Sequence, residues 1–266
     1  DQIDRDNVHQ LEVAWRWTAE NSAERPFFNF ESTPLMIGGV LYTSTGASEV
    51  AAIDAATGQT KWVFTPLPKP GTEDIPSQRP QGSGRGVAYW TDGGDDTRIF
   101  FGTSEGYLIA LDAHTGKPVL EFGDNGRVDL MAGIPRAVRG ETTHHGHNLV
   151  GVASPPIVAR DIVVTPMVIS DGPIRKEAVP GWVKGVDAHT GDLRWIFRTV
   201  PQADDFGAET WLDESWRYSG NANVWTMFSV DDELGHIYLP TGTPTADYYG
   251  GHRPGNNLFA ESLIAL

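Results

Sequence analysis

The sequence predicts an all-β protein that folds as a β-propeller, and two repeated features lead to this prediction. A turn phrase of the form Asp-x-x-Thr-Gly occurs three times, in AAIDAATGQTKW, IALDAHTGKPVL and KGVDAHTGDLRW. A run rich in β-branched and aromatic residues precedes each phrase, as GGVLYTST, TRIFFGTS and DIVVTPMVI. Such a repeated unit is typical of folds in which each unit covers the apolar face of the next. We therefore expect about four four-stranded blades, with a short helix near Asp4 to Leu11.

The residue types in the phrase explain why it forms a turn and how it joins two blades. An aspartate can accept hydrogen bonds from backbone N–H groups two and three residues later, and glycine supplies the positive φ of a tight turn. Trp62 and Trp195 stand four residues after the glycine, and Leu120 takes this place in the second copy. An indole there can pack against the neighbouring blade while its N–H donates to a carbonyl. The phrase is therefore predicted to dock one blade onto the next.

The last residues, ESLIAL, begin a fourth copy. Ala265 and Leu266 correspond to Ala52 and Ile53, so the aspartate of another turn is expected next. A propeller needs a closed ring. We therefore expect residues 1–266 to be one partial propeller domain, roughly the N-terminal half of a longer protein, which stops inside the fourth docking motif.

Composition excludes several classes of function. The net charge of −15 argues against nucleic acid or an anionic membrane surface as a partner. The absence of cysteine excludes disulfides, thiolate metal sites and a cysteine nucleophile. No apolar run approaches the roughly 18 residues of a membrane helix, and the opening DQIDRDNVHQLEVAW lacks the pattern of a signal peptide. We expect no membrane segment in this chain.

Several segments add a specific family resemblance to the repeats. Essentially the whole chain resembles the quinoprotein dehydrogenases, which hold pyrroloquinoline quinone (PQQ) and a calcium ion inside an eight-bladed propeller. Besides the docking phrases, the segments that carry this resemblance are LEVAWRW, ESTPLMIGGVLYTST, GRGVAYW and RPGNNLFAESLIAL. The chain is most similar to the branch that oxidises glucose and other sugars or polyols. The resemblance implies hydride transfer from a hydroxyl-bearing carbon to PQQ, a respiratory electron acceptor and a periplasmic location. The catalytic aspartate of the family follows the fourth docking turn, so we expect it outside this chain.

The resemblance also assigns residues to the cofactor. It places five at PQQ: Glu31, Arg85, Ser154, Asn223 and Trp225. Glu31 would hydrogen-bond the quinone, Arg85 would grip a PQQ carboxylate, and Trp225 would lie flat against the quinone plane. Asn223 holds the neighbouring polar position, and Ser154 is a possible substitute for a threonine of the relatives, whose position is taken here by Ala153. Arg85 could instead be a surface arginine, and Trp225 could instead belong to the apolar core.

For calcium, the resemblance indicates Asp171 in VISDGP and Thr243 in PTGTP. An aspartate and a neutral oxygen suit this hard cation, although Asp171 could equally be an ordinary Asp-Gly turn. Alcohol-oxidising relatives cover the quinone with a pair of adjacent cysteines, whereas this chain has SQRPQGSGRG in the corresponding stretch. The cover must therefore be built from other residues.

Other interpretations remain open. A non-catalytic propeller could use the same docking phrases as a scaffold for protein assembly, and an alcohol-oxidising quinoprotein would share most of the sequence features. His144, His145 and His147 could suggest a transition-metal site, but we favour histidines that line the mouth above the quinone. The acidic stretch TDGGDDTR lacks the glutamate that completes an EF-hand loop, so a solvated hairpin tip is expected there.

Overall fold

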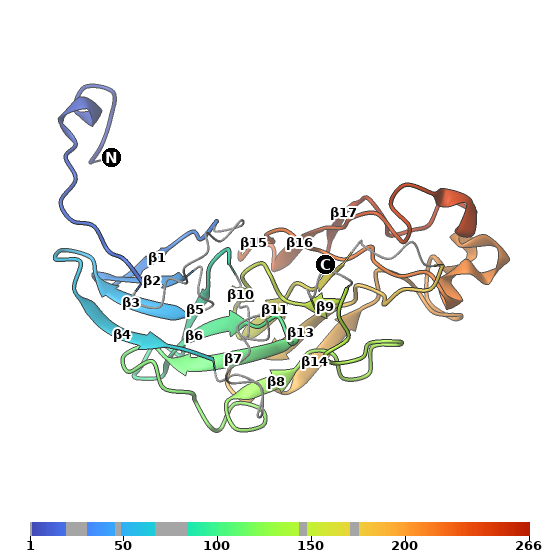
Figure 1. The fold of residues 1–266 in the computed structure, drawn as a ribbon, viewed down its shortest axis with the longest axis horizontal. Helices are drawn as coiled ribbons and strands as arrows, with labels where there is room; N and C mark the ends of the chain where they lie inside the picture. Colours follow the sequence, from blue (N-terminus) through green and yellow to red (C-terminus); the bar gives the residue numbers. More distant parts are fainter. Residues whose placement is uncertain (1, 20–30, 46–48, 67–83, 144–147, 171–175) are drawn as a thin grey trace.

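The computed structural model describes residues 2–19, 31–45, 49–66, 84–143, 148–170 and 176–266. Within them, antiparallel sheets follow one another along the chain, from the blue β1–β4 sheet to the red strands near the C-terminus (Figure 1). This arrangement confirms the predicted all-β propeller architecture. We number the four main sheets as the first to the fourth blade.

Three blades have four strands and the fourth has three. The first blade contains β1 (Leu35–Ile37), β2 (Val40–Ser44), β3 (Val50–Asp54) and β4 (Thr60–Phe64). The second contains β5 (Ala88–Thr91), β6 (Thr97–Gly102), β7 (Tyr107–Asp112) and β8 (Arg127–Asp129). The third contains β10 (Ile157–Ala159), β11 (Ile162–Thr165), β13 (Val183–Asp187) and β14 (Leu193–Phe197). The fourth contains β15 (Ser229–Asp231), β16 (His236–Pro240) and β17 (Leu263–Ala265).

The remaining elements are small. β9 (Val150–Gly151) and β12 (Val168–Ile169) form a separate two-stranded sheet. The helices among the described residues are 3-10 turns: η1 (Val8–Gln10), η3 (Ala208–Thr210), η4 (Leu212–Arg217) and η5 (Gly250–His252). The helix expected near Asp4 to Leu11 is only η1, because no residue of this segment is buried against another element and an isolated short helix is marginal in water. In the part of the chain that the structure describes, no helix is long and apolar enough to span a membrane.

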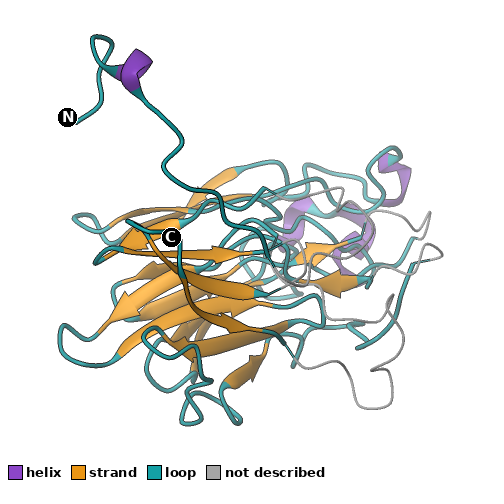
Figure 2. Ribbon diagram, turned by 60° about the vertical axis from the view of Figure 1, so that its left-hand side comes forward, coloured by secondary structure: helices purple, strands orange, loops and turns teal. Residues whose placement is uncertain are grey.

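The core lies between the blades, which stack face to face (Figure 2). Strand β6 shows how alternation produces this core, since successive side chains point to opposite faces of a sheet. Ile99 and Phe101 pack in the cluster shared with the first blade, whereas Phe100 packs in the cluster shared with the third blade. All three side chains are fully buried. A blade covered on both faces therefore has strands that read as continuous apolar runs.

The docking phrases form the predicted turns. In the first, Asp54 Oδ1 accepts hydrogen bonds from the N–H groups of Ala56 and Thr57 at 3.1 and 2.9 Å. Gly58 follows with a φ of 73°, a conformation that glycine adopts without strain. Asp112 and Asp187 accept from the N–H groups of the corresponding threonines at 2.7 and 2.8 Å.

The predicted docking role of Trp62 is also confirmed. Its indole N–H donates to the carbonyl of Ala113 in the turn of the second blade at 3.0 Å. Its ring lies so close to Gly116 that a Cβ atom there would stand 2.5 Å from the indole. Trp15, in the extended segment before the first blade, contacts the first turn in the same way, with a 3.1 Å hydrogen bond to the Ala55 carbonyl.

The seam between the second and third blades is built differently. Leu120, which aligns with the docking tryptophans, does not lie in the interface, and its side chain is 63% exposed. The chain makes a loop after Lys117, and the outer strand β8 starts only at Arg127. Within this loop the N–H of Gly123 donates to the Thr190 carbonyl of the third docking turn at 2.9 Å. Position 120 therefore does not dock the second blade onto the third, because an insertion separates the turn from its outer strand.

The third turn provides a pH-dependent prediction. Burial raises the pKa of the Asp187 carboxyl, but hydrogen bonds from Arg194, Thr190 and His189 outweigh burial and lower this pKa from 3.8 to about 2. A carboxyl whose pKa is lower in the folded state stabilises the fold above the unfolded pKa and loses this contribution as the pH falls through the folded one. We expect the free energy of unfolding to lose about 1–2 kcal/mol from this group between pH 5 and pH 2. Urea denaturation of Asp187→Asn should lack that part of the pH dependence, and an unchanged pH profile would contradict this interpretation.

Candidate functional site

The blades have two distinguishable ends. The inner strands β1, β5, β10 and β15 all start at one end, which we call the entry end. The Asp-x-x-Thr-Gly turns join the third and fourth strands of the first three blades, so antiparallel order places them at the opposite end, which we call the turn end. Four of the predicted cofactor residues precede the inner strands by a few positions, one in each blade: Glu31, Arg85, Ser154 and Trp225. They therefore all belong to the entry end.

Arg85 forms hydrogen bonds with the other three residues of this group. Its Nε donates to Glu31 Oε2 at 2.7 Å, and its Nη1 donates to Ser154 Oγ at 3.1 Å. The same Nη1 donates to the main-chain carbonyl of Trp225 at 2.8 Å. The guanidinium thus links all four blades, and no described residue accepts a hydrogen bond from Nη2. Among the described residues, Nη2 is the nitrogen that could donate to a carboxylate of a ligand.

The backbone between the first two blades fixes the arginine. The N–H of Glu31 donates to the Gly84 carbonyl at 3.2 Å, and the N–H of Thr33 donates to the Arg85 carbonyl at 3.1 Å. Gly86 has a φ of 136°, and a Cβ atom there would meet the Thr33 carbonyl at 3.1 Å. A glycine directly after Arg85 is therefore required for this close approach of two chains.

Trp225 provides a flat surface beside the cation. Its side chain is 52% exposed, which is unusual for a tryptophan in a folded domain, and Arg85 Cζ lies 5.5 Å from the ring centroid. The hydroxyl of Ser154, itself fully buried, donates to the Trp225 carbonyl at 2.5 Å. The core-packing interpretation of Trp225 is therefore wrong. An exposed indole face next to a cation suits a planar, anionic ligand.

The hydrogen bonds of Asn223 go to residues outside the group of Glu31, Arg85, Ser154 and Trp225. The side chain of Asn223 is buried, and Nδ2 donates to the Met167 carbonyl at 2.8 Å. Its main-chain carbonyl accepts from the N–H of Gly242 at 3.0 Å. The structure therefore gives Asn223 a supporting position, two residues before Trp225, without a contact to the Arg85 group. Whether it touches a cofactor stays a prediction.

The two predicted calcium ligands cannot be compared directly, because Asp171 lies outside the described residues. Thr243 is described, and its hydroxyl donates to Glu261 Oε1 at 2.7 Å. Gly242, next to Thr243, lies against the edge of the Trp225 indole, and its carbonyl accepts from the N–H of Glu261. No group of three or more His, Asp or Glu side chains in the described ranges is arranged to hold a metal ion. His144, His145 and His147 also lie outside those ranges.

Sequence reasoning missed two features of the site. The carbonyl of Trp225 accepts hydrogen bonds from both Arg85 and Ser154. The type of a residue does not predict that its main-chain carbonyl will accept hydrogen bonds from distant side chains. Glu261, to which no role was assigned from the sequence, lies beside Thr243. Three non-glycine residues that precede Trp225 in the chain or flank the Gly242–Thr243 segment have positive φ, namely Asn221, Ala222 and Glu261. Such strained residues are typical of functional sites.

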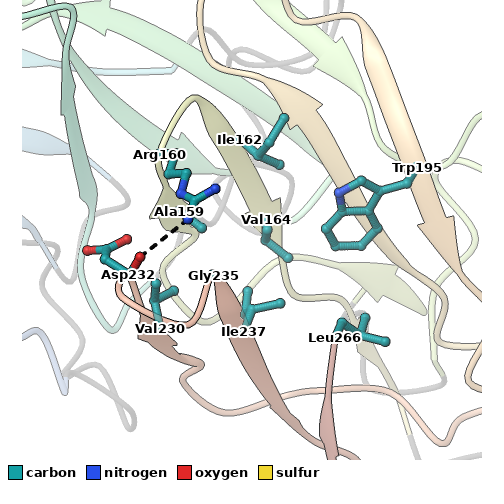
Figure 3. Close-up of a pocket in the computed structure, with 10 residues that line it drawn as sticks. All are labelled: Ala159, Arg160, Ile162, Val164, Trp195, Val230, Asp232, Gly235, Ile237 and Leu266. Carbon is teal, nitrogen blue, oxygen red and sulfur yellow. Dashed lines mark hydrogen bonds between the residues drawn. The ribbon is translucent and has the colours of Figure 1, made fainter.

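A separate apolar pocket lies between the third and fourth blades. It has a volume of about 260 Å³ and is lined mainly by aliphatic side chains and the ring of Trp195. Figure 3 shows the indole at one side and Arg160 at the other, where the guanidinium donates to the Asp232 carbonyl at 3.4 Å. Arg160 and Asp232 belong to turns after the inner strands β10 and β15, so the pocket opens at the turn end. It is therefore distinct from the Arg85 group.

The fold and this group define a propeller that gathers one polar or aromatic residue from each blade around a potential ligand. The whole chain, residues 1–266, matches the family model described as "PQQ: Glucose/ethanol/alcohol dehydrogenase, beta-propeller domain". The chain belongs to this family of quinoprotein dehydrogenases, as the resemblance predicted.

Individual relatives agree with this assignment. The chain is 31% identical to the quinohemoprotein alcohol dehydrogenase ADH IIB of Pseudomonas putida and 32% identical to the glycerol dehydrogenase large subunit of Gluconobacter oxydans (strain 621H). Both alignments cover 100% of this chain and 35% of the relative. The crystal structure of quinohemoprotein alcohol dehydrogenase from Comamonas testosteroni superposes with a TM-score of 0.76 at 28% identity, covering 100% of this chain and 36% of that one. The chain thus spans about a third of the length of these proteins.

Proposed function

We propose that this chain forms part of the cofactor site of a PQQ- and calcium-dependent dehydrogenase that oxidises a hydroxyl group of a sugar or polyol. The observation that carries the proposal is the convergence of Glu31, Arg85, Ser154 and Trp225 from four blades. PQQ is a planar quinone with several carboxylates, and the group offers Arg85 Nη2 as a charged donor beside an exposed indole face. The residues present therefore fit this cofactor.

Each residue has a definite task in the proposed site. Arg85 would bind a PQQ carboxylate through Nη2, while Glu31 and Ser154 hold the guanidinium in place. Trp225 would support the ring plane, and Ser154 fixes its backbone by donating to the carbonyl. When bound, the quinone supplies a two-electron acceptor and calcium supplies a Lewis acid. We assign no residue of this chain as the base that takes the substrate proton.

For calcium we propose Asp171 and Thr243 as ligands. The Glu261 carboxylate at 2.7 Å from the Thr243 hydroxyl supports an oxygen-rich position there, which is what a hard cation requires. Catalysis outside the cytoplasm and electron transfer to a respiratory acceptor also belong to this proposal, and they rest on the family alone.

Two alternatives are distinguished by one experiment. An alcohol-oxidising enzyme is favoured by the similarity to the Pseudomonas putida relative, and a scaffold would need no cofactor. We expect the full-length enzyme to bind added PQQ in the presence of calcium, with a change in the quinone absorbance, and to reduce a dye faster with glycerol or glucose than with ethanol. Faster reduction with ethanol would favour the alcohol dehydrogenase. A quinone spectrum that the protein does not change would favour the scaffold.

A further inference from the structure

The seam between the second and third blades lacks a docking tryptophan, but the carbonyl that such a tryptophan would bind is occupied. In the first two turns the residue after the aspartate, Ala55 or Ala113, accepts an indole N–H. The equivalent residue of the third turn is Ala188. Its carbonyl accepts from Arg98 Nη1 at 3.0 Å, and Arg98 is a residue of the second blade.

Arg98 is unusually well satisfied for a buried charge. Nε and Nη2 form a two-point contact with the carboxylate of Asp96, at 2.8 and 2.6 Å. Nη1 donates to the His189 carbonyl at 2.5 Å in addition to Ala188, and Nη2 lies 3.3 Å from His189 Nδ1. Each of the three guanidinium nitrogens thus has an acceptor, although only 4% of the side chain is exposed. A buried arginine that is paired through all three nitrogens specifies one geometry across an interface.

A tryptophan completes this arrangement from an inner strand. Arg98 Cζ lies 5.4 Å from the ring centroid of Trp90, and the Trp90 indole N–H donates to Asp161 Oδ1 of the third blade at 3.0 Å. Trp90 belongs to β5, and Asp161 follows β10 in the turn that leads to β11. The second and third blades are therefore joined at the turn end through side chains of Arg98 and Trp90.

The arginine is specific to this seam. Strand register pairs Arg98 with Asp112, and the same register pairs Val40 with Asp54 and Ile162 with Asp187. The other two blades thus carry an aliphatic residue at the position of Arg98. Among the three blades whose docking turn the structure describes, a charged residue stands there in the one whose outer strand lacks the docking tryptophan.

We infer that Arg98, held by Asp96, is a latch that replaces the docking tryptophan and closes the seam between the second and third blades. Two main-chain hydrogen bonds across the same seam can report on its opening. At the turn end the N–H of Gly123 donates to the Thr190 carbonyl, and toward the entry end the N–H of Val152 donates to the Thr103 carbonyl at 3.0 Å. The contact of Arg85 with Ser154 also lies at the entry end, so the latch holds together the two blades that supply these residues.

Hydrogen exchange of single amides tests this inference, because exchange measures the free energy of local opening. The variant Arg98→Lys keeps the charge but loses the planar fork that reaches Asp96 and two carbonyls at once. We expect the amides of Gly123 and Val152 to exchange roughly tenfold faster, which corresponds to about 1.4 kcal/mol of lost local stability. The amides of Ala55 and Gly58, in the tryptophan-docked first turn, should keep their rates.

The matched control is Arg194→Lys. Arg194 contacts Asp187 in the same docking turn at 2.7 Å, but its side chain is 54% exposed. This variant should leave the Gly123 and Val152 rates unchanged. Unchanged Gly123 exchange in Arg98→Lys, or equal acceleration of Ala55 and Gly58, would overturn the latch. Acceleration of Gly123 without Val152 would overturn the claim that Arg98 closes the seam. None of these outcomes depends on PQQ, so they are independent of the proposed function.

Discussion

Replacement of Trp62 by alanine is expected to lower the free energy of unfolding by about 3–4 kcal/mol. Three contributions would be lost together: the ring packing on Gly116, the hydrogen bond to the Ala113 carbonyl, and the contact with Tyr42, whose ring centroid lies 6.0 Å away. Because Ala113 is buried, its carbonyl would also lose a partner in a place that water reaches poorly, although the Tyr42 hydroxyl still donates to it at 3.2 Å. Urea denaturation followed by circular dichroism measures this difference.

Trp195 provides the matched control for Trp62. It has the same place in its docking phrase and its ring packs against the apolar cluster of the third and fourth blades, but residues 1–266 do not include a fourth Asp-x-x-Thr-Gly turn that could accept its indole N–H. We expect Trp195→Ala to cost only about 1 kcal/mol, since there is less packing to lose. Equal losses in the two variants would contradict the conclusion that contact with the next turn, rather than the tryptophan itself, provides the stabilisation.

The second large effect concerns Arg85. Arg85→Ala is expected to weaken PQQ binding by roughly 30-fold or more, or about 2 kcal/mol. The substitution removes the only cation in the group of four. It also removes the hydrogen-bond partner of the Glu31 carboxylate, the Ser154 hydroxyl and the Trp225 carbonyl. Arg85→Lys should retain part of the affinity, since a lysine keeps the charge but not the fork. Quenching of tryptophan fluorescence during titration with PQQ measures both affinities.

The control for Arg85 is Arg160→Ala, which removes a cation from the turn end of the molecule. The PQQ affinity of this variant should equal that of the unmodified chain. Loss of affinity to the same extent in both variants would show that net charge, rather than the geometry at the entry end, governs binding.

Features that depend on neighbouring residues could be predicted from the sequence. The turn at Asp54 is an example, because the acceptor, the donors and the glycine lie within five residues. The docking of Trp62 could also be predicted, since an aromatic residue at a fixed distance after a turn must face the next repeat. Resemblance to a family then added Glu31, Arg85, Ser154 and Trp225, which the structure brings together from positions far apart in the chain.

Features that depend on the three-dimensional arrangement could not be predicted in the same way. The exposed position of Leu120 could not be predicted, because the loop after Lys117 changes the spacing between the turn and the outer strand. The contact of Arg98 with the third blade could not be predicted from the sequence, because its partners include a main-chain carbonyl 90 residues away. Asn223 followed the family pattern in sequence, but the backbone turns its amide toward Met167. Main-chain acceptors and side-chain directions require the folded structure.

The most direct test of the central claim is a crystal structure of the protein with PQQ and calcium. Our account predicts quinone density at the entry end, with a carboxylate against Arg85 Nη2 and the ring plane parallel to the Trp225 indole. It also predicts that the contact of Arg85 with Glu31 persists in the complex. Quinone density at the turn end, in the pocket beside Trp195, or at the entry end without contact to Arg85 and Trp225, would contradict the account.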